Sequence, residues 1–343
     1  MKKHLWALCF SMVLIAFTAY IALDTFVIST GYAAATGMNT EMFSDVSEST
    51  ETSQVTIPTE TAIQSDDNIN NNGGSSSEHK ENAYSGNSDT ESSNLIDHDA
   101  SSSYSDENTY TTDNYSITLT EYYQYNTRIY VADVTLTSAE YLKTAFADDT
   151  YGKNITEKTS TIAQANNAVL AINGDCYGVQ ESGYVIRNGI VYRDTAKDAD
   201  VMCIYTDGTM EIVYDCDCTA YELVDNGVWQ AFTFGPALLD DGNITVGEND
   251  EVGKAKASNP RTAIGVIDAN HFVFVVSDGR TSESAGLSLY ELATFMQSLG
   301  VKTAYNLDGG GSSTMYFNGS VVNNPTTGGS IKERGVSDIV YIG

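Results

Sequence analysis

The spacing of apolar residues divides the chain into three regions. Residues 5–23 form one uncharged, largely apolar run, residues 36–112 contain few apolar positions, and short apolar runs recur from about residue 113 to the end. Strict apolar–polar alternation is typical of strands, and apolar residues three to four apart are typical of helices. The pattern predicts a signal segment over 1–35, a stalk over 36–112 and a folded domain over 113–343.

Most of the predicted domain has the pattern of strands. Alternation rich in Tyr, Ile, Val and Thr predicts two strands within 115–137 that turn near Asn126. Asn188-Gly189 and Asp207-Gly208 are strong hairpin signals. Further strands are predicted at 168–174, 302–308, 313–317 and 336–343, with another pair inside 261–280 that turns near Ala269-Asn270.

Few segments have a helical pattern. A short helix is predicted within 160–167, and Ser288 with Glu291 fits a capping box that opens a second helix. Gly300 stands at the expected C-terminal stop of that helix. Its apolar residues at helical spacing are Leu292, Phe295, Met296 and Leu299. The predicted fold class is α+β: one globular domain with a mixed, mainly antiparallel sheet and a few packed helices.

The apolar run at 5–23 follows Lys2 and Lys3. A helix of this length spans about 28 Å at ~1.5 Å per residue, which is close to the thickness of a bilayer core. Cleaved signal peptides usually have a shorter apolar region of roughly 7–15 residues. We therefore expect a signal anchor in the cell membrane with the domain outside. Secretion after cleavage near 32–35 stays open as the alternative.

Composition and charge exclude some partners. Ser, Thr, Asn and acidic residues dominate 36–112, where Lys80 is the only lysine or arginine, so this region is predicted to be a disordered stalk. Much of the formal net charge of −29 comes from the stalk, and the predicted domain is acidic too. We therefore expect no nucleic-acid partner, and contact with the membrane only through the N-terminal helix.

The cysteines leave the redox state open. Cys176, Cys203, Cys216 and Cys218 fall in the predicted domain, and outside the cytoplasm they could form disulfides in any of three pairings. Cys216 and Cys218 have no nearby histidine, so a metal site there is not predicted. No cofactor is predicted. A structural calcium ion held by scattered carboxylates stays open, although no EF-hand spacing is present.

Polar residues gather where the predicted strands end. Such loops commonly carry function on a rigid scaffold, although each could be only a turn. The loops are 173–178, 259–262, 277–280, 306–313 and 332–335. His271 is the only histidine of the predicted domain and is expected to lie at a turn, so a Ser-His-Asp arrangement is not favoured. The chain has no P-loop motif and no Rossmann fingerprint. Carboxylates and arginines are therefore the candidate residues for catalysis and ligand binding.

The run Asp308-Gly309-Gly310-Gly311 is the most unusual of these loops. Three glycines are costly to order, which suggests that something must approach the main chain closely. Successive backbone N–H groups can bind an anion, and arginine matches phosphate oxygens. We expect a phosphate or a sugar ring to lie against these glycines, with Asp308 facing it and the hydroxyls of Ser312 and Ser313 donating to it.

Five segments in this order resemble the phosphodiester glycosidase family. They are 172–178, 259–266, 277–300, 306–315 and 333–342, and the resemblance runs from about Asn154 to the C-terminus. It implies hydrolysis of a sugar–phosphate diester at the sugar side, with phosphate leaving. It also implies a polar cleft formed by Asn173, Gly174, Arg261, Asp278, Asp308, Gly309, Gly310, Gly311 and Ser312. The chain departs from the family at Asp175 and Cys176, where many members have glycine and aromatic residues, and at Gly335, where proline is common.

Roles follow as hypotheses. Asp308 is the first candidate for nucleophile or general base, with Asp278 or Asp175 as its partner. Arg261, Arg280 and Arg334 are candidates for phosphate binding. Three structural alternatives stay open: a surface ion pair between Asp278 and Arg280, an Asx turn at Asp175, and a core salt bridge at Arg261.

The function expected from the residues and the resemblance is an extracytoplasmic hydrolase. Its substrate would be a glycosyl phosphodiester, and its setting cell-envelope or exopolysaccharide metabolism. Two alternatives use the same features. One is a cell-surface protein that binds envelope polysaccharide without turnover. The other is a glycosyl or phosphoglycosyl transferase that acts in envelope polymer assembly.

Overall fold

The computed structural model describes residues 12–20, 30–31, 104–105, 108–250 and 258–343. Most of the predicted stalk and the predicted cleavage site at 32–35 lie outside the described residues. Of the apolar run at 5–23, residues 12–20 are described, and they are helical. Among the helices that the structure describes, none combines the length and the hydropathy needed to cross a bilayer.

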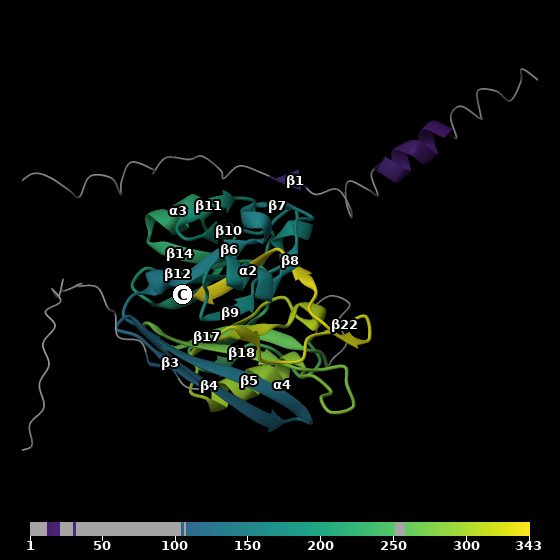
Figure 1. The fold of residues 1–343 in the computed structure, drawn as a ribbon. Helices are drawn as coiled ribbons and strands as arrows, with labels where there is room; N and C mark the ends of the chain where they lie inside the picture. The colour runs from purple at the N-terminus through teal and green to yellow at the C-terminus, as the bar shows by residue number, and fades with distance from the viewer. Residues whose placement is uncertain (1–11, 21–29, 32–103, 106–107, 251–257) are drawn as a thin grey trace, which may run out of the picture. The chain divides into compact units, whose positions relative to one another are not determined.

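The described strands form three larger sheets (Figure 1). The large sheet is formed, in spatial order, by β16 (Asn243–Ile244), β15 (Ala237–Asp240), β19 (Thr303–Asn306), β17 (Arg261–Asp268), β18 (His271–Ser277), β5 (Thr127–Leu136), β4 (Tyr115–Gln124), β3 (Thr109–Thr111) and β2 (Tyr104–Ser105). Strands β2 and β3 precede residue 113, so the described sheet begins before the expected start of the domain.

Each of the two smaller sheets is named by one of its inner strands. The β9 sheet contains β21 (Ser320–Val321), β20 (Met315–Phe317), β9 (Leu170–Asn173), β25 (Asp338–Ile342) and β6 (Leu142–Phe146). The β12 sheet contains β11 (Ile190–Arg193), β10 (Val185–Arg187), β14 (Val228–Phe232), β12 (Asp200–Tyr205) and β13 (Met210–Tyr214). Short two-stranded pairs are formed by β1 (Thr30–Gly31) with β7 (Gly152–Lys153), β22 (Thr326–Thr327) with β23 (Ser330–Ile331), and β24 (Gly335–Val336) with β8 (Glu157–Lys158).

Alternation along the strands gives the large sheet two apolar faces. One face, with Ile264, Phe272 and Phe274, shares a core with residues of the β9 and β12 sheets. The opposite face, with Ala263, Val273 and Val275, packs against helix α4 (Leu289–Ser298). Figure 1 shows α4 below β17 and β18, with the β9 sheet above them. A strand buried on both faces needs a continuous run of apolar residues, as residues 263–267 of β17 and 272–276 of β18 provide.

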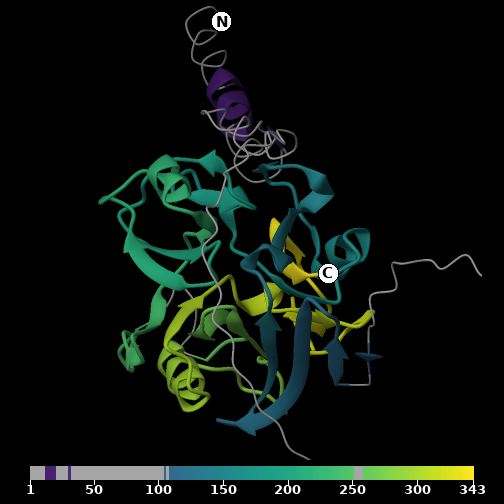
Figure 2. The ribbon, with the colours of Figure 1, turned by 90° about the vertical axis from the view of Figure 1, so that its left-hand side faces the viewer.

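Two short helices cover the outer faces of the smaller sheets. Helix α2 (Thr159–Ala165) packs Ile162 and Ala163 onto the β9 sheet. Helix α3 (Ala220–Asp225) packs Ala220 and Leu223 onto the β12 sheet. Figure 2, turned by 90°, shows α3 beside the strands of the β12 sheet and apart from α4. Short 3₁₀ turns complete the described elements: η2 (Ala139–Tyr141), η3 (Ala147–Asp149), η4 (Tyr177–Val179) and η5 (Gly310–Ser312).

The turn chemistry explains why the hairpins were predictable. Tyr125 and Asn126 both have positive φ, as do Asn188 and Gly189, so each pair forms a two-residue turn that matches the strand twist. The predicted turn at Ala269-Asn270 joins β17 to β18. The capping box of Ser288 and Glu291 is present, and Gly300 has positive φ just after the helix.

The mainly antiparallel character is confirmed, since every pairing among the described strands is antiparallel. The strands do not form the one sheet that was expected. The described strands divide among three larger sheets and three two-stranded pairs, and the larger sheets pack together because an apolar face on each must be covered by another layer. The four described cysteines are free thiols.

The contribution of the capping box to the stability of helix α4 can be tested directly. Ser288→Ala removes the side-chain acceptor of the Glu291 N–H, which is 3.1 Å away, and should lower the free energy of unfolding by about 1 kcal/mol. Ser282→Ala is the control, because Ser282 is exposed and caps no helix, and it should change stability by less than about 0.5 kcal/mol. Urea unfolding measures both, and equal effects would contradict the assigned cap.

Candidate functional site

The antiparallel register brings several polar loops to one edge of the large sheet. Arg261 at the start of β17 pairs with Ser277 at the end of β18, and Ala263 pairs with Asn306 at the end of β19. The segments that precede β17 and follow β18 and β19 therefore leave the sheet together. The predicted gathering of polar residues at strand ends is confirmed for these three loops.

Asn173 links the β9 sheet to the same edge. Its side chain is fully buried, and its Nδ2 donates to the backbone oxygens of Asp308, at 2.6 Å, and Gly174, at 3.1 Å. Its Oδ1 accepts from Thr262 Oγ1 at 2.8 Å and from the Thr314 N–H at 3.3 Å. Both the oxygen and the nitrogen of the Asn173 amide are hydrogen-bonded, and the side chain has no exposed surface. Asn173 therefore connects the β9 sheet, the large sheet and the glycine loop.

Asp308 is the carboxylate of this edge that solvent can reach. Its side chain is 16% exposed, and its Oδ2 accepts from Ser312 Oγ at 2.6 Å and from Arg334 Nη2 at 2.7 Å. Burial raises the pKa of the Asp308 carboxyl, while Arg334 and Ser312 lower it. Ser312 is itself buried, and Arg334 Nε donates to its hydroxyl at 3.0 Å. Asp308, Ser312 and Arg334 thus form one hydrogen-bonded triad.

The three glycines are each crowded by a different neighbour. A β-carbon at position 309 would lie 2.9 Å from the Pro260 carbonyl oxygen. At position 310 it would lie 2.8 Å from Arg280 Nη2, and at position 311 it would lie 2.5 Å from Thr327 Oγ1. Gly310 also has a φ of +64°. The loop's own packing therefore requires all three glycines, and their contact with a phosphate stays a prediction.

Asp278 does not form the surface ion pair with Arg280 that the sequence left open. Its side chain is 2% exposed, and its carboxylate accepts from the Asn324 N–H at 2.7 Å, Asn324 Nδ2 at 3.0 Å and Asn323 Nδ2 at 3.3 Å. Arg280 donates instead to Asn259 Oδ1, at 2.9 Å from Nη2. That interpretation is wrong because the strand end turns Asp278 inward onto the 323–324 loop.

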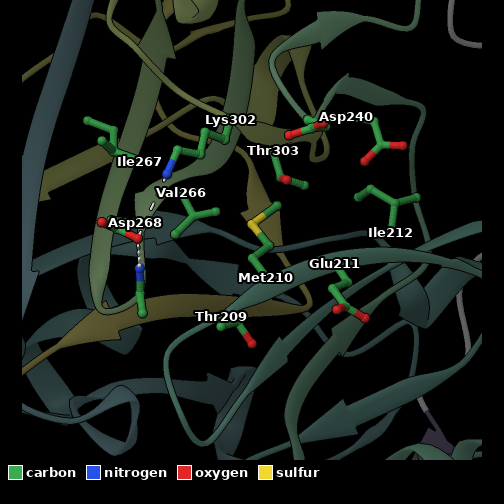
Figure 3. Close-up of a pocket in the computed structure, with 12 residues that line it drawn as sticks. Thr209, Met210, Glu211, Ile212, Asp240, Val266, Ile267, Asp268, Lys302 and Thr303 are labelled. Atoms are coloured by element: carbon green, nitrogen blue, oxygen red, sulfur yellow. Dashed lines mark hydrogen bonds and ion pairs between the residues drawn. The ribbon is translucent and has the colours of Figure 1, made fainter.

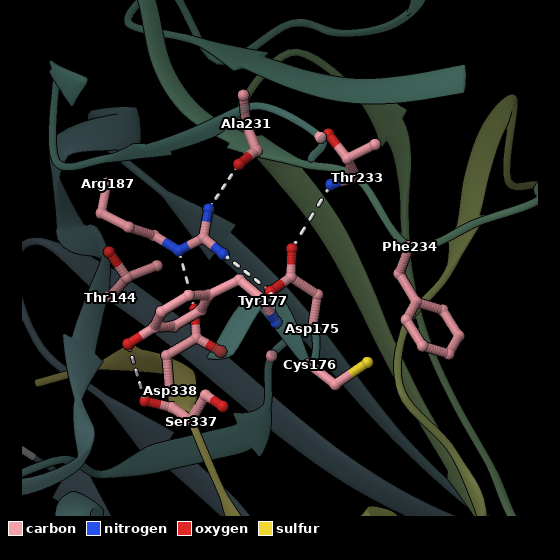
Figure 4. Close-up of polar contacts among 12 residues, drawn as sticks. Thr144, Asp175, Cys176, Tyr177, Arg187, Ala231, Thr233, Phe234, Ser337 and Asp338 are labelled. Atoms are coloured by element: carbon pink, nitrogen blue, oxygen red, sulfur yellow. Dashed lines mark hydrogen bonds and ion pairs between the residues drawn. The ribbon is translucent and has the colours of Figure 1, made fainter. Parts of the chain in front are cut away.

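Asp175 lies in a buried ion cluster around Arg187 (Figure 4). Its Oδ1 accepts from the Tyr177 N–H at 3.0 Å, which confirms the Asx turn, and lies 3.2 Å from Arg187 Nη2. Arg187 Nε also donates to Asp338 Oδ2 at 2.7 Å, and its Nη1 donates to the Ala231 carbonyl. The side chains of Arg187, Asp175 and Asp338 are at most 2% exposed. No hydrogen bond joins the carboxylates of Asp175 or Asp278 to Asp308 among the described residues.

Asp338 connects this cluster to the candidate site through Gly174. A β-carbon at position 174 would lie only 2.3 Å from Asp338 Oδ1, so glycine is needed there. The Gly174 N–H donates to the Asp338 carbonyl at 3.0 Å, and the Gly174 carbonyl accepts from the Asp308 N–H at 3.4 Å. Burial raises the pKa of the Asp338 carboxyl, and Arg187 opposes that shift. The ion cluster thus supports the backbone that carries Asp308.

The remaining predicted residues differ in their access to solvent. Arg261 is 3% exposed, and its Nε donates to the Leu287 carbonyl at 2.9 Å. Ser313 is fully buried, and its hydroxyl makes no hydrogen bond within the described residues. Arg280 is exposed. A ligand arriving from solvent can therefore meet Arg280, Arg334 and Asp308 before it meets Arg261 or Ser313.

One cavity lies away from this edge. It has a volume of about 470 Å³ and lies at the opposite end of β17 and β19, where Val266, Asp268, Lys302 and Thr303 line it (Figure 3). His271 is also at that end, directly after the turn, with its Nε2 2.9 Å from Asp133 Oδ1. Groups of three or more His, Cys, Asp or Glu side chains able to hold a metal are absent from the described part of the chain.

Sequence reasoning missed the partners that hold the candidate residues. Arg187 and Asp338 were not singled out, although a charged residue inside an apolar strand, as in 336–342, indicates a buried ion pair. Asn323 and Asn324 were also missed, and Asn259 was noted only as part of the loop at 259–262. Their amide contacts join loops far apart in the sequence, so no local pattern marks them.

The chain belongs to the phosphodiester glycosidase family, whose sequence model matches residues 166–343. An uncharacterized protein, YomE, from the SPbeta prophage of Bacillus subtilis is 29% identical over 200 residues, which cover 56% of this chain and 30% of that protein. Mouse and human proteins named N-acetylglucosamine-1-phosphodiester alpha-N-acetylglucosaminidase are 34% and 32% identical over 101 and 135 residues. These matches cover 26% and 36% of this chain and 19% and 26% of the relatives, so the chain spans less than a third of each curated protein.

Solved structures show the same fold. The catalytic domain of the zebrafish enzyme of that name, auto-inhibited by its pro-peptide, superposes with a TM-score of 0.53 at 21% identity, covering 66% of this chain and 82% of that one. A hypothetical protein from Synechocystis superposes with a TM-score of 0.52 at 15% identity, covering 67% of this chain and 62% of that one.

The contact between Gly174 and Asp338 can be tested by adding one methyl group. Gly174→Ala places a β-carbon against a carboxylate that Arg187 holds in place, so we expect a loss of about 1–3 kcal/mol in the free energy of unfolding. Gly247→Ala is the matched control, because its β-carbon would meet only ordinary contacts at 3.6 Å or more. Denaturant unfolding compares the two, and equal stability would contradict the proposed crowding at position 174.

Proposed function

We propose that this protein is a hydrolase that cleaves the sugar–phosphate bond of a glycosyl phosphodiester. The observation that carries the proposal is the triad of Asp308, Ser312 and Arg334 at a strand edge that Arg280 also borders. Membership of the phosphodiester glycosidase family supports the reaction class. The names of the mouse and human relatives suggest N-acetylglucosamine-1-phosphodiesters as the first substrates to try.

The proposed reaction breaks the bond between the anomeric carbon and the phosphate oxygen. The oxygen of water becomes attached to the anomeric carbon, and the phosphate monoester leaves with the bonding electron pair. If Asp308 is the general base, it takes the proton of the attacking water. If Asp308 is the nucleophile, it first forms a glycosyl ester that water then hydrolyses. Both routes need an ionised and accessible carboxylate, and Asp308 meets the access requirement where Asp175, Asp278 and Asp338 do not.

The proposed setting is outside the cytoplasm. The uncharged run at 5–23 behind two lysines supports a membrane anchor, and the acidic, Ser/Thr-rich region at 36–112 supports a stalk between the anchor and the domain. A substrate in the cell envelope or in exopolysaccharide would suit this arrangement, and we propose one of these polymers as the natural source of the phosphodiester.

Replacing Asp308 tests the proposed activity. Asp308→Asn should abolish sugar release from N-acetylglucosamine-1-phosphodiesters, because an amide can neither attack the anomeric carbon nor accept a proton from water. Unfolding stability should stay within about 1–2 kcal/mol of the wild type, since the carboxylate is partly exposed. The control is Asp268→Asn at the opposite end of the sheet, where the side chain is 80% exposed.

The assay is release of free sugar by the full-length chain. Retained turnover in Asp308→Asn would reject the role of Asp308. If the folded wild type binds the diesters without releasing sugar, the proposed function would change from hydrolysis to binding. If sugar is released only when an acceptor is added, the proposed function would change from hydrolysis to transfer.

Arg334 should set the pH dependence of the same reaction. Arg334 lowers the pKa of Asp308, so Arg334→Gln should raise that pKa and leave less ionised Asp308 at a given acidic pH. The acid limb of the kcat/KM profile should therefore move to higher pH. Arg128→Gln, an exposed arginine paired with Glu121, is the control and should leave the profile in place. A shift to lower pH in Arg334→Gln would contradict the assigned ionisation state.

A further inference from the structure

The arginines near the candidate site have different partners. Arg187 is buried and paired with two carboxylates, and Arg261 is buried with its Nε on a backbone carbonyl. Arg334 donates to Asp308, so its positive charge is balanced by that carboxylate. Arg280 is exposed and forms no ion pair within the described residues. The sequence offered Arg261, Arg280 and Arg334 as candidates for phosphate binding, and the structure gives each of them different partners.

Arg280 is nevertheless held in one place. Its Nε and Nη2 both donate to Asn259 Oδ1, at 3.3 and 2.9 Å, and Asn259 is 3% exposed. The backbone of Arg280 has a φ of +61°, a conformation that costs a non-glycine residue roughly 1–2 kcal/mol. Such strain persists where the surrounding structure imposes it, and it is frequent at ligand-binding sites. The Nη1 group makes no hydrogen bond within the described residues, so it can donate to a ligand.

The contact with Gly310 places this cation beside the triad. A β-carbon at position 310 would lie 2.8 Å from Nη2 and 3.4 Å from Nη1 of Arg280, so the guanidinium occupies the space that a side chain there would fill. Gly310 is two residues from Asp308 and two from Ser312 along the same loop. Glycine at this position therefore lets an unbalanced positive charge approach the loop that carries the candidate nucleophile or base.

From these contacts we propose that Arg280 binds the phosphate group of the substrate, and that Asn259 is the positioning residue that aims it. Arg334 instead holds Asp308. The assignment rests on the proposed function for the identity of the ligand. A guanidinium with free N–H groups matches phosphate oxygens, and a neutral amide partner such as Asn259 orients it without neutralising its charge. Arg280 would then be the residue that favours phosphodiesters over uncharged glycosides.

Phosphate binding tests the proposal without relying on turnover. Inorganic phosphate is titrated into the full-length chain by calorimetry for the wild type, Arg280→Gln, Arg280→Lys and Arg128→Gln. Losing a charge-assisted contact should raise the Kd for phosphate about tenfold or more in Arg280→Gln. Arg280→Lys should fall between wild type and Arg280→Gln, because lysine keeps the charge and loses the planar fork. Arg128→Gln should match the wild type.

A second variant separates ligand binding from a merely structural role. Asn259→Asp gives Arg280 a carboxylate partner in place of the amide, so the pair should compete with phosphate and raise its Kd even though Arg280 is still present. If Arg280 only supported the loop, a stronger bond to residue 259 would leave phosphate binding unchanged. Thermal unfolding of each variant confirms that the chain is folded.

The outcomes distinguish this proposal from the proposed function. Equal Kd values for wild type and Arg280→Gln, or no phosphate binding by the folded wild type, would overturn the role of Arg280. Loss of phosphate binding in Arg280→Gln without sugar release by the wild type would support the anion site and reject the hydrolase. Release with the same KM for phosphodiesters in Arg280→Gln and wild type would overturn the anion site and leave the hydrolase standing.

Discussion

The buried guanidinium of Arg187 is the constraint on which the geometry of the candidate site depends. Removing such a charge from water is costly unless carboxylates and carbonyls surround it, so Asp175, Asp338 and the Ala231 carbonyl must lie where Arg187 can reach them. Arg187 belongs to the β12 sheet, while Asp338 belongs to the β9 sheet and Asp175 follows its central strand. One cation therefore fixes two sheets against each other. Asp338 in turn leaves space only for glycine at position 174, and the Gly174 carbonyl accepts from the Asp308 backbone.

Access to solvent then divides groups that are chemically alike. Four carboxylates lie near this edge, and Asp175, Asp278 and Asp338 are each 2% exposed or less, whereas the side chain of Asp308 is 16% exposed. The buried three are surrounded by N–H donors or by Arg187, which suits a structural anion. Asp308 has a partly exposed arginine and a serine on one oxygen. This difference in environment, more than residue type, makes Asp308 the candidate for chemistry.

Local signals carried most of what the sequence could predict. The hairpins at Asn188-Gly189 and Ala269-Asn270 and the cap at Ser288 depend on residues within a few positions of one another, and the structure has all three. The division into three sheets depends on which apolar face covers which, and alternation alone does not say that. The same limit applies to the site. Asp308 could be singled out as a candidate because three glycines follow it, whereas the partners of Asp278 and Arg280 come from loops tens of residues away.

The glycine run shows why a motif can be recognised before its physical reason is known. Glycine is required wherever a β-carbon would collide, and a substrate and a neighbouring side chain impose that requirement equally. In this structure Pro260, Arg280 and Thr327 each occupy the space beside one glycine of the run. Two of these neighbours only pack the loop, but the third carries a charge that no carboxylate balances within the described residues. Its position matters because the chain is acidic, with a formal net charge of −29, and a net negative charge repels an anionic substrate. In the proposed role, the exposed guanidinium of Arg280 would direct a phosphate to the edge where Asp308 lies, and Gly310 would serve the ligand by leaving space for that arginine.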